Sequence, residues 1–115
     1  MRKKTDPLAA WQRQYRQLCA GLAALGYISQ GSTLDRCTLR PPRSGYQWTR
    51  KVARRTITVA LSPEQYRELS QAVQNRRQLQ QTLRQMEKLS RQILFRSLPD
   101  TRRRKSLSKG ALGLI

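Results

Sequence analysis

The sequence lacks histidine altogether and has only six acidic residues among 115, so it has few of the side chains that acid–base and metal chemistry use. None of the six acids forms a recognisable catalytic pair. Glu64 and Glu68 are the only close carboxylates, and the charged first turn of a helix explains them. The two cysteines, Cys19 and Cys37, have no other ligand-type residues with which to complete a zinc site. We therefore expect a protein that is not an enzyme and that has no metal or other cofactor.

The two cysteines also raise the questions of a disulfide and of a reactive thiol. The sequence leaves a disulfide between them open but gives it no support, and Cys19, beside an apolar helical pattern, is expected to pack. Cys37 lies near Arg36, Arg40 and Arg43, whose charges could lower the pKa of its thiol. Without histidine or a partner acid, a nucleophilic role for this thiol is disfavoured.

Long apolar runs are missing as well. No segment approaches the roughly 18 apolar residues that mark a membrane-spanning helix, and polar residues follow "MRKK" too soon for a signal peptide. We expect a cytoplasmic protein with reduced cysteines, associated with the nucleoid if it binds DNA. Attachment to an anionic membrane surface is a weaker alternative, because the aromatic residues are not grouped with a basic helix face.

What the sequence has in abundance is positive charge. Its 18 arginines and six lysines give a net charge of +18 and a pI of about 11.6. The excess is spread along the chain, and residues 31–61, with seven basic side chains against one acid, are the most basic for their length. A compact chain with this charge repels itself, so a polyanionic partner is expected. Arginine grips phosphate or guanine with two bonds, which favours a nucleic acid as that partner.

An N-terminal helix is predicted over residues 7–25. Asp6 is a good N-cap, Pro7 suits the first helical position, and Gly26 is expected to end the helix. Apolar residues recur at alternating spacings of three and four: Leu8, Trp11, Tyr15, Leu18, Leu22 and Leu25. This seam is typical of a helix that packs against another helix.

Residues 31–61 show the period of β-strands. Strands are predicted at about 32–39, 46–51 and 55–61, and the Pro/Gly-rich "RPPRSG" forms a loop between the first two. In "YQWTRKVARRTITVAL" (46–61), alternation assigns five residues mainly to the core: Tyr46, Trp48, Ile57, Val59 and Leu61. The opposite face is polar. The connection "VARR" lacks the Asn-Gly or Asp-Gly that best specifies a tight hairpin.

A long helix is predicted over residues 63–97. Ser62, Pro63 and Gln65 form a capping-box pattern, and apolar positions follow at Tyr66, Leu69, Val73, Leu79, Leu83, Met86, Leu89, Ile93 and Leu94. A break near residues 74–78 would instead give a helical hairpin. The predicted fold is a small α+β protein, with a single domain over residues 1–97 and a basic tail over residues 98–115. This tail is expected to order on a partner.

Three blocks carry a resemblance to a known family: "GSTLDR" (31–36) followed by a cysteine, "YQWTRKVARRTITVALSPEQ" (46–65), and "NRRQLQQTLRQM" (75–86). They resemble a family of small basic prokaryotic proteins classed as a domain of unknown function, whose members often lie near mobile-element genes. The resemblance covers about residues 30–95 and implies a DNA-related accessory role. The family's cysteine cluster is reduced here to Cys37, so a metal role does not carry over. Its hairpin glycine is replaced within "VARR", so we expect a wider or bulged turn.

The candidate nucleic-acid-binding residues are basic side chains of the predicted loop, hairpin, long helix and tail. They are Arg36, Arg40, Arg43, Arg50, Lys51, Arg54, Arg55, Arg76, Arg77, Arg102, Arg103, Arg104 and Lys105. Arg76 and Arg77 could equally belong to a solvated helix face, and the tail could be merely solubilising. Tyr46 and Trp48 are candidates for base stacking, but covering the helical layer of a small core is the simpler interpretation.

Two functions remain in view. The first is a non-enzymatic nucleic-acid-binding accessory protein, with duplex DNA favoured and RNA as an alternative, that binds phosphates through the hairpin and the tail and serves a mobile-element or recombination system. The second is an assembly subunit of a larger protein or ribonucleoprotein complex, with the basic surface on RNA. In either case a homodimer or a larger protein partner would be contacted through helices 7–25 and 63–97.

Overall fold

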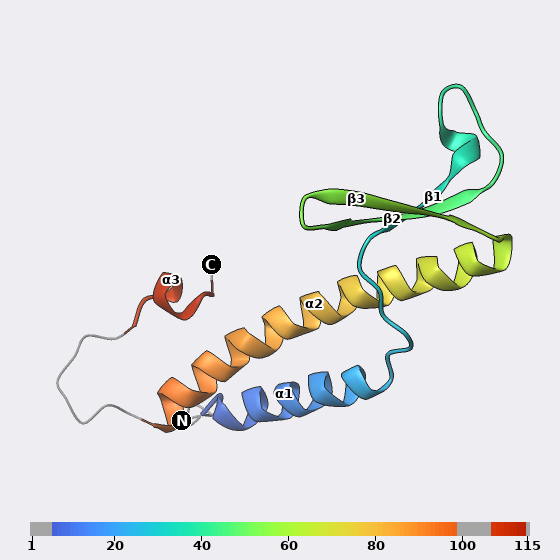
Figure 1. Ribbon diagram of the computed structural model, residues 1–115. Coiled ribbons are helices and arrows are strands. Elements are labelled where there is room, and N and C mark those ends of the chain that lie inside the picture. Colours follow the sequence, from blue (N-terminus) through green and yellow to red (C-terminus); the bar gives the residue numbers. More distant parts are fainter. Residues whose placement is uncertain (1–5, 99–106, 115) are drawn as a thin grey trace. The chain divides into compact units, whose positions relative to one another are not determined.

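The computed structural model describes residues 6–98 and 107–114 (Figure 1). The elements in chain order are α1 (Leu8–Ala23), β1 (Ser32–Asp35), the 3₁₀-helix η1 (Arg36–Thr38), β2 (Tyr46–Val52), β3 (Arg55–Leu61), α2 (Pro63–Ser97) and α3 (Lys109–Leu112). The predicted α+β class is confirmed. The sequence predicts one domain over residues 1–97, whereas the folded chain groups into two compact units. One unit is Leu25–Gln80 and the other combines Met1–Ala24 with Gln81–Ile115, so each is described by itself.

The sheet belongs to the unit of residues 25–80 and is antiparallel in the order β1-β2-β3. Tyr46 pairs with Leu61 at one end of the hairpin, and Val52 pairs with Arg55 at the other. Because paired residues point to the same side, the hairpin has two faces. The apolar face carries Tyr46, Trp48, Arg50, Val52, Arg55, Ile57, Val59 and Leu61, and the polar face carries Gln47, Thr49, Lys51, Thr56, Thr58 and Ala60.

The sheet is held to the first half of α2 by a small core and a few specific contacts. The rings of Tyr46 and Tyr66 stack with centroids 4.3 Å apart, and the Ser70 hydroxyl donates to the Thr33 hydroxyl at 2.8 Å. Among the described residues only Ala72 and Val73 of α2 are buried, at 5% and 6% exposure. With so little apolar burial, hydrogen bonds and ring contacts must position the sheet.

The prediction that Ile57 and Val59 belong to the core is wrong. Their side chains are 37% and 42% exposed, and Val52 on the same face is 38% exposed. The sheet meets α2 through Thr33, the second residue of β1, and Tyr46, the first residue of β2. Alternation identified the face correctly, but the middle of β3 is left largely uncovered.

The first strand is shorter than predicted, because it ends at Asp35 rather than near residue 39. The Asp35 carboxylate accepts a hydrogen bond from the Cys37 N–H at 3.1 Å, and the Thr38 hydroxyl donates to the Asp35 carbonyl at 2.8 Å. This local side-chain bonding competes with the strand ladder and turns the chain into η1. The backbone of Arg36 then closes the loop, since its N–H donates to Gly45 and its carbonyl accepts from Arg43.

Residues 25–30 run along α2 and join α1 to the sheet. The Ser29 N–H donates to the Ala72 carbonyl at 3.1 Å, and the Asn75 side-chain amide donates to the Tyr27 carbonyl at 2.9 Å. The helix α1 ends at Ala23, not at 25, and Gly26 has no positive φ. A Cβ on Gly26 would lie 3.3 Å from the Asn75 amide nitrogen. This glycine therefore leaves space for the hydrogen bond between Asn75 and Tyr27, and it does not end the helix.

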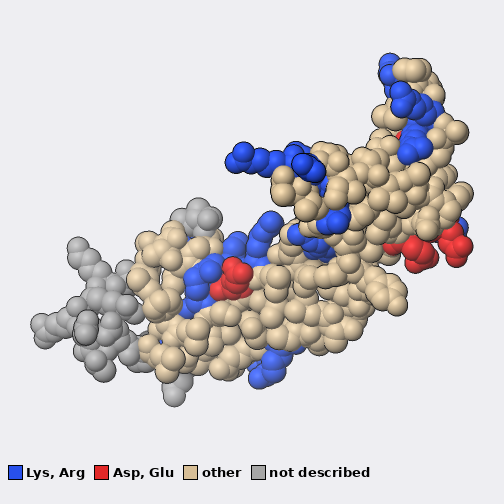
Figure 2. Space-filling model, in the orientation of Figure 1, with Lys and Arg blue, Asp and Glu red and all other residues tan. Residues whose placement is uncertain are grey.

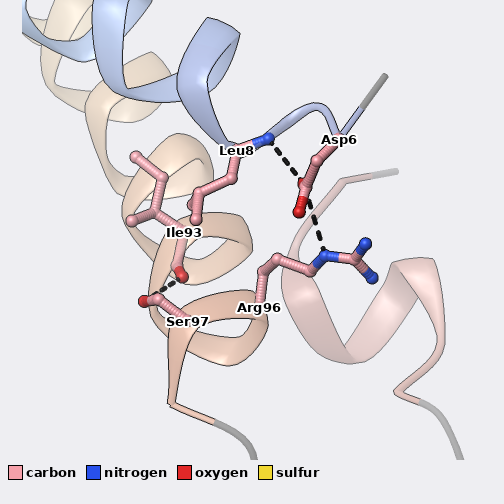
Figure 3. A network of polar contacts seen from close by, with 5 residues as sticks. All are labelled: Asp6, Leu8, Ile93, Arg96 and Ser97. Carbon is pink, nitrogen blue, oxygen red and sulfur yellow. Dashed lines mark hydrogen bonds and ion pairs between the residues drawn. The ribbon is translucent and has the colours of Figure 1, made fainter. Parts of the chain in front are cut away.

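In the other unit, α1 presents the predicted seam. Leu8, Trp11, Tyr15, Leu18 and Leu22 are half-buried, whereas most of the remaining helix is exposed. Asp6 supports the start of α1 by accepting from the Leu8 N–H at 3.0 Å, and its carboxylate also lies 3.5 Å from the Arg96 guanidinium (Figure 3). Near the end of α2, the Ser97 hydroxyl donates back to the Ile93 carbonyl at 2.7 Å (Figure 3).

The long helix α2 is continuous over its 35 residues, which decides against a helical hairpin. The capping box is confirmed: the Gln65 N–H donates to the Ser62 hydroxyl at 3.1 Å, and the Ser62 N–H donates to the Gln65 side-chain oxygen at 2.9 Å. The seam is only partly correct, because Leu83 and Leu94 are 42% and 54% exposed. No described helix combines the length and apolar character needed to cross a membrane.

The predicted tail contains one short helix, α3, which the sequence analysis did not anticipate. The Ser108 hydroxyl accepts from the Ala111 N–H at 3.0 Å, and Gly113 ends the turn at a φ of 72°. The Arg91 guanidinium of α2 donates to the Leu112 carbonyl. A cation at a helix C-terminus satisfies a carbonyl left without a partner in the helix, so Arg91 anchors this turn.

Gly31 makes the tightest backbone approach at the sheet, and its replacement tests the packing there. Its φ is 99°, and a Cβ would lie 2.5 Å from the Thr49 carbonyl oxygen and 2.6 Å from the Trp48 indole nitrogen. We expect Gly31→Ala to cost at least ~2 kcal/mol in urea denaturation, from backbone strain and steric clash. Gly21→Ala is the matched control, because a Cβ there meets nothing within 4 Å. It should stabilise the helix by ~0.5–1 kcal/mol, and equal stability of the two variants would contradict the described packing.

Candidate nucleic-acid interface

The β2–β3 hairpin closes in a tight turn rather than the predicted wider one. Val52 pairs with Arg55, so only Ala53 and Arg54 lie between the strands. Both have positive φ, 48° and 67°, which is the left-handed geometry of a two-residue type I′ turn. Its twist matches that of the paired strands, so the ladder imposes the turn on residues that do not favour it.

Three of the four predicted hairpin cations lie at this tip. Lys51, Arg54 and Arg55 are exposed, and they come from the polar face, the turn and the apolar face respectively. Lys and Arg atoms project from the hairpin in Figure 2. We call these three residues the tip cluster. Because these charges lie on both faces of the hairpin and in its turn, the positive charge surrounds the tip of the hairpin and is not confined to one face.

Arg50 does not belong to the tip cluster. It is half-buried on the apolar face, and its guanidinium carbon lies 5.6 Å from the centre of the Trp48 ring. Its Nε is buried without a hydrogen-bond partner. The arginine therefore covers the indole in a cation–π contact.

A second cationic group lies in the loop of residues 36–45, at the opposite end of β2. Arg40 and Arg43 are exposed, and Arg36 is half-buried with its Nε donating to the Gln47 side-chain oxygen at 3.2 Å. We call these three arginines the loop cluster. The six steps of β2 from Tyr46 to Val52 separate the two clusters by about 20 Å at ~3.4 Å per residue.

The loop also determines the chemistry of Cys37. The Asp35 carboxylate bonds to Cys37, which lowers the pKa of Asp35 and raises the pKa of the thiol. The direction is opposite to the one expected from the neighbouring arginines, because the hydrogen bond to the Asp35 carboxylate favours the protonated thiol. The thiol is held in its protonated, less nucleophilic form. No group of three or more metal-ligating side chains occurs within residues 6–98 and 107–114.

Arg76 and Arg77 lie on the first half of α2, with Arg76 half-buried and Arg77 exposed. Residues 25–80 hold ten basic side chains against three acids. In the described part of the chain, the single ion pair joins Arg96 to Asp6, in the other unit. The basic residues of the sheet unit are therefore not neutralised by carboxylates. The predicted tail cations Arg102, Arg103, Arg104 and Lys105 lie outside the described residues.

Both candidate stacking residues are engaged within the fold. Tyr46 stacks on Tyr66 with an angle of 23° between the rings. The Trp48 indole N–H donates to the Gln30 carbonyl at 2.9 Å, and its ring contacts Arg50. These contacts favour the packing interpretation, and base stacking by either residue stays a prediction.

Sequence reasoning missed two polar residues that organise this unit. Asn75 accepts from the Gln71 amide at 3.0 Å while donating to the Tyr27 carbonyl, and Gln47 orients Arg36. The "NRR" block draws attention to its arginines, but its asparagine makes the structural contact. The contacts to Tyr27 and Arg36 have no local sequence signal, because Tyr27 lies 48 residues from Asn75 and Arg36 lies 11 residues from Gln47.

Three comparisons of this chain with known proteins were made. No family model matches it, and neither a curated protein nor a solved structure is similar to it. The resemblance to a family of small basic prokaryotic proteins therefore stays a prediction, and the function must be argued from the residues.

The strained turn can be tested without changing any charge. We expect Ala53→Gly to stabilise the protein by ~0.5–1 kcal/mol, because glycine adopts positive φ without a Cβ clash. Ala60→Gly, the same change inside β3, should cost a similar amount, since glycine weakens a regular strand. Urea denaturation followed by tryptophan fluorescence would measure both. Destabilisation by both substitutions would argue against the tight turn.

Proposed function

We propose that the protein is a non-enzymatic nucleic-acid-binding protein that favours duplex DNA and contacts its phosphates. The observation that carries this proposal is the set of exposed, unneutralised cations at both ends of β2. A cationic group with no carboxylate partner gains no ion-pair energy within the fold, but it gains energy when phosphate replaces water and counterions. The tail cations Arg102 to Lys105 would add to this attraction.

The spacing of the two clusters suits a duplex. The polar face between them carries Gln47, Thr49, Thr56 and Thr58, which are neutral hydrogen-bonding side chains. The major groove of B-DNA is about 12 Å wide and admits a two-stranded ribbon. With clusters about 20 Å apart along β2, each can lie against a phosphate backbone while the polar face lies over the groove. This mode positions the protein without requiring sequence specificity.

The resemblance seen in the sequence extends the proposal to a biological setting. A DNA-binding accessory protein near mobile-element genes would serve a recombination or transposition system by holding or covering DNA. Such a protein would work in the cytoplasm, associated with the nucleoid.

Salt dependence measures the phosphate contacts directly. We expect log K for duplex DNA to fall linearly with log salt, and the variant K51Q/R54Q/R55Q to lower the slope by ~2.7, about 0.9 for each lost contact. The matched control is R13Q/R16Q/R84Q, which removes three exposed arginines of the other unit. Fluorescence anisotropy with a labelled duplex would give both slopes. Equal slopes for the two variants would contradict a role for the tip cluster.

A second candidate function is that of an assembly subunit, and one observation favours it. Leu83 and Leu94 on one face of the second half of α2, and Leu98 directly after the helix end, are 42%, 54% and 69% exposed. An exposed apolar stripe on a helix is typical of a protein-contact surface. A partner that packs on this stripe could be another protein or a ribonucleoprotein.

The stripe can be tested by sedimentation. If it mediates assembly, L83Q/L94Q/L98Q should sediment as a smaller species than the unsubstituted protein at the same concentration, because the apolar contact is lost. Val52→Gln is the control, since Val52 is an exposed apolar residue of the hairpin, outside the stripe. An unchanged distribution would count against assembly through α2.

A further inference from the structure

Within residues 6–98 and 107–114, no strand pairs with the outer edge of β3. β3 pairs with β2 on one side, and the strand order places it at the border of the sheet. Residues 55–60 are all exposed, and 56–61 read "TITVAL", with no charge and no proline. Natural proteins usually protect such edges with charge, proline or a covering element, because free N–H and C=O groups recruit another strand. Here only Arg55, at the end of the strand, provides charge.

The hairpin register determines which backbone groups face this edge. Val52 and Arg55 flank a two-residue turn, so they form a hydrogen-bonded pair. In an antiparallel ladder such pairs alternate with non-hydrogen-bonded pairs. Ile57, Val59 and Leu61 therefore bond to β2, whereas Thr56, Thr58 and Ala60 direct their N–H and C=O groups outward. The edge offers three consecutive outward-facing residues.

We propose that this edge binds the β3 edge of a second copy of the protein, antiparallel and centred on Thr58. In this register Thr58 lies opposite its symmetry mate, and Thr56 lies opposite Ala60 of the other copy. All outward-facing residues of both copies are then paired. Ile57 of each copy lies beside Val59 of the other on the apolar face, and such β-branched cross-strand neighbours stabilise sheets.

The distribution of charge favours a second copy in this register. The strand centre is neutral in both copies, and Arg55 lies opposite Leu61 of the other copy. The two Arg55 residues are therefore separated by six strand steps, about 20 Å at ~3.4 Å per residue. This distance is more than twice the Debye length of ~8 Å at physiological salt, so their repulsion is largely screened. An edge that carried a central lysine would not permit this pairing.

The dimer would be a continuous six-stranded sheet, in the order β1-β2-β3-β3-β2-β1. The two polar faces would join on one side, with a tip cluster toward each end of the central strands. For a polyanion, two linked copies bind more tightly than two separate ones, because the second contact is intramolecular. The pairing itself does not depend on the proposed DNA binding.

Cross-linking tests the register. In a background with Cys19 and Cys37 replaced by serine, we expect Thr58→Cys to form an intermolecular disulfide under mild oxidation. The opposed Cα atoms of a hydrogen-bonded pair lie about 5.5 Å apart, within disulfide range. Thr56→Cys is the matched control, because the two Thr56 positions would be about 14 Å apart across the pair. Cross-linking of Thr56→Cys in place of Thr58→Cys, or of neither, would overturn the proposal.

A second variant tests the pairing of the β3 edge without disrupting the fold of the hairpin. Thr58→Pro removes an outward N–H but no hydrogen bond to β2, so the hairpin should persist while the pairing is lost. Sedimentation at raised salt should show a dimer for the unsubstituted protein and a monomer for Thr58→Pro, with the same circular dichroism. A monomeric unsubstituted protein would overturn this inference. DNA binding by that monomer would leave the proposed function intact.

Discussion

The close approach of Gly31 to Trp48 and Thr49 is the constraint on which the sheet unit depends. Because residue 31 has no Cβ, the chain can pass beneath the indole, and the Gln30 carbonyl can accept its N–H. This contact starts β1 in register with β2 and also joins the segment 25–30 to the sheet. With only two side chains buried among the described residues, there is little apolar packing to replace it.

The parts of the fold that were predictable from the sequence are those with local causes. The α1 seam and the capping box at Ser62 depend on spacings of three or four residues, and both are confirmed. The exposure of Ile57 was not predictable, because alternation shows which residues share a face but not what covers it. The turn at Ala53 was missed for a related reason, since strand pairing overrides the preference of its residues.

The cations of the candidate interface show a similar division. Their abundance is evident from composition, but their grouping follows from strand geometry. Alternation sends Arg50 to Trp48 and Lys51 to the polar face, although the two are adjacent in sequence. Two clusters result, separated by the length of β2, and the proposed binding to a duplex depends on that separation. Consecutive basic residues in a strand therefore do not form one basic surface patch, because they point to opposite faces of the sheet.

The left-handed conformation of Arg54 has a consequence for how this protein can change. A residue with a Cβ at that φ costs ~1 kcal/mol or more, so glycine or asparagine there would be favoured by folding alone. Either replacement would also remove a charge from the tip. Selection for thermal stability and selection for the proposed polyanion binding would therefore act in opposite directions at this position. Libraries screened only for stability would be enriched in variants with a less cationic hairpin.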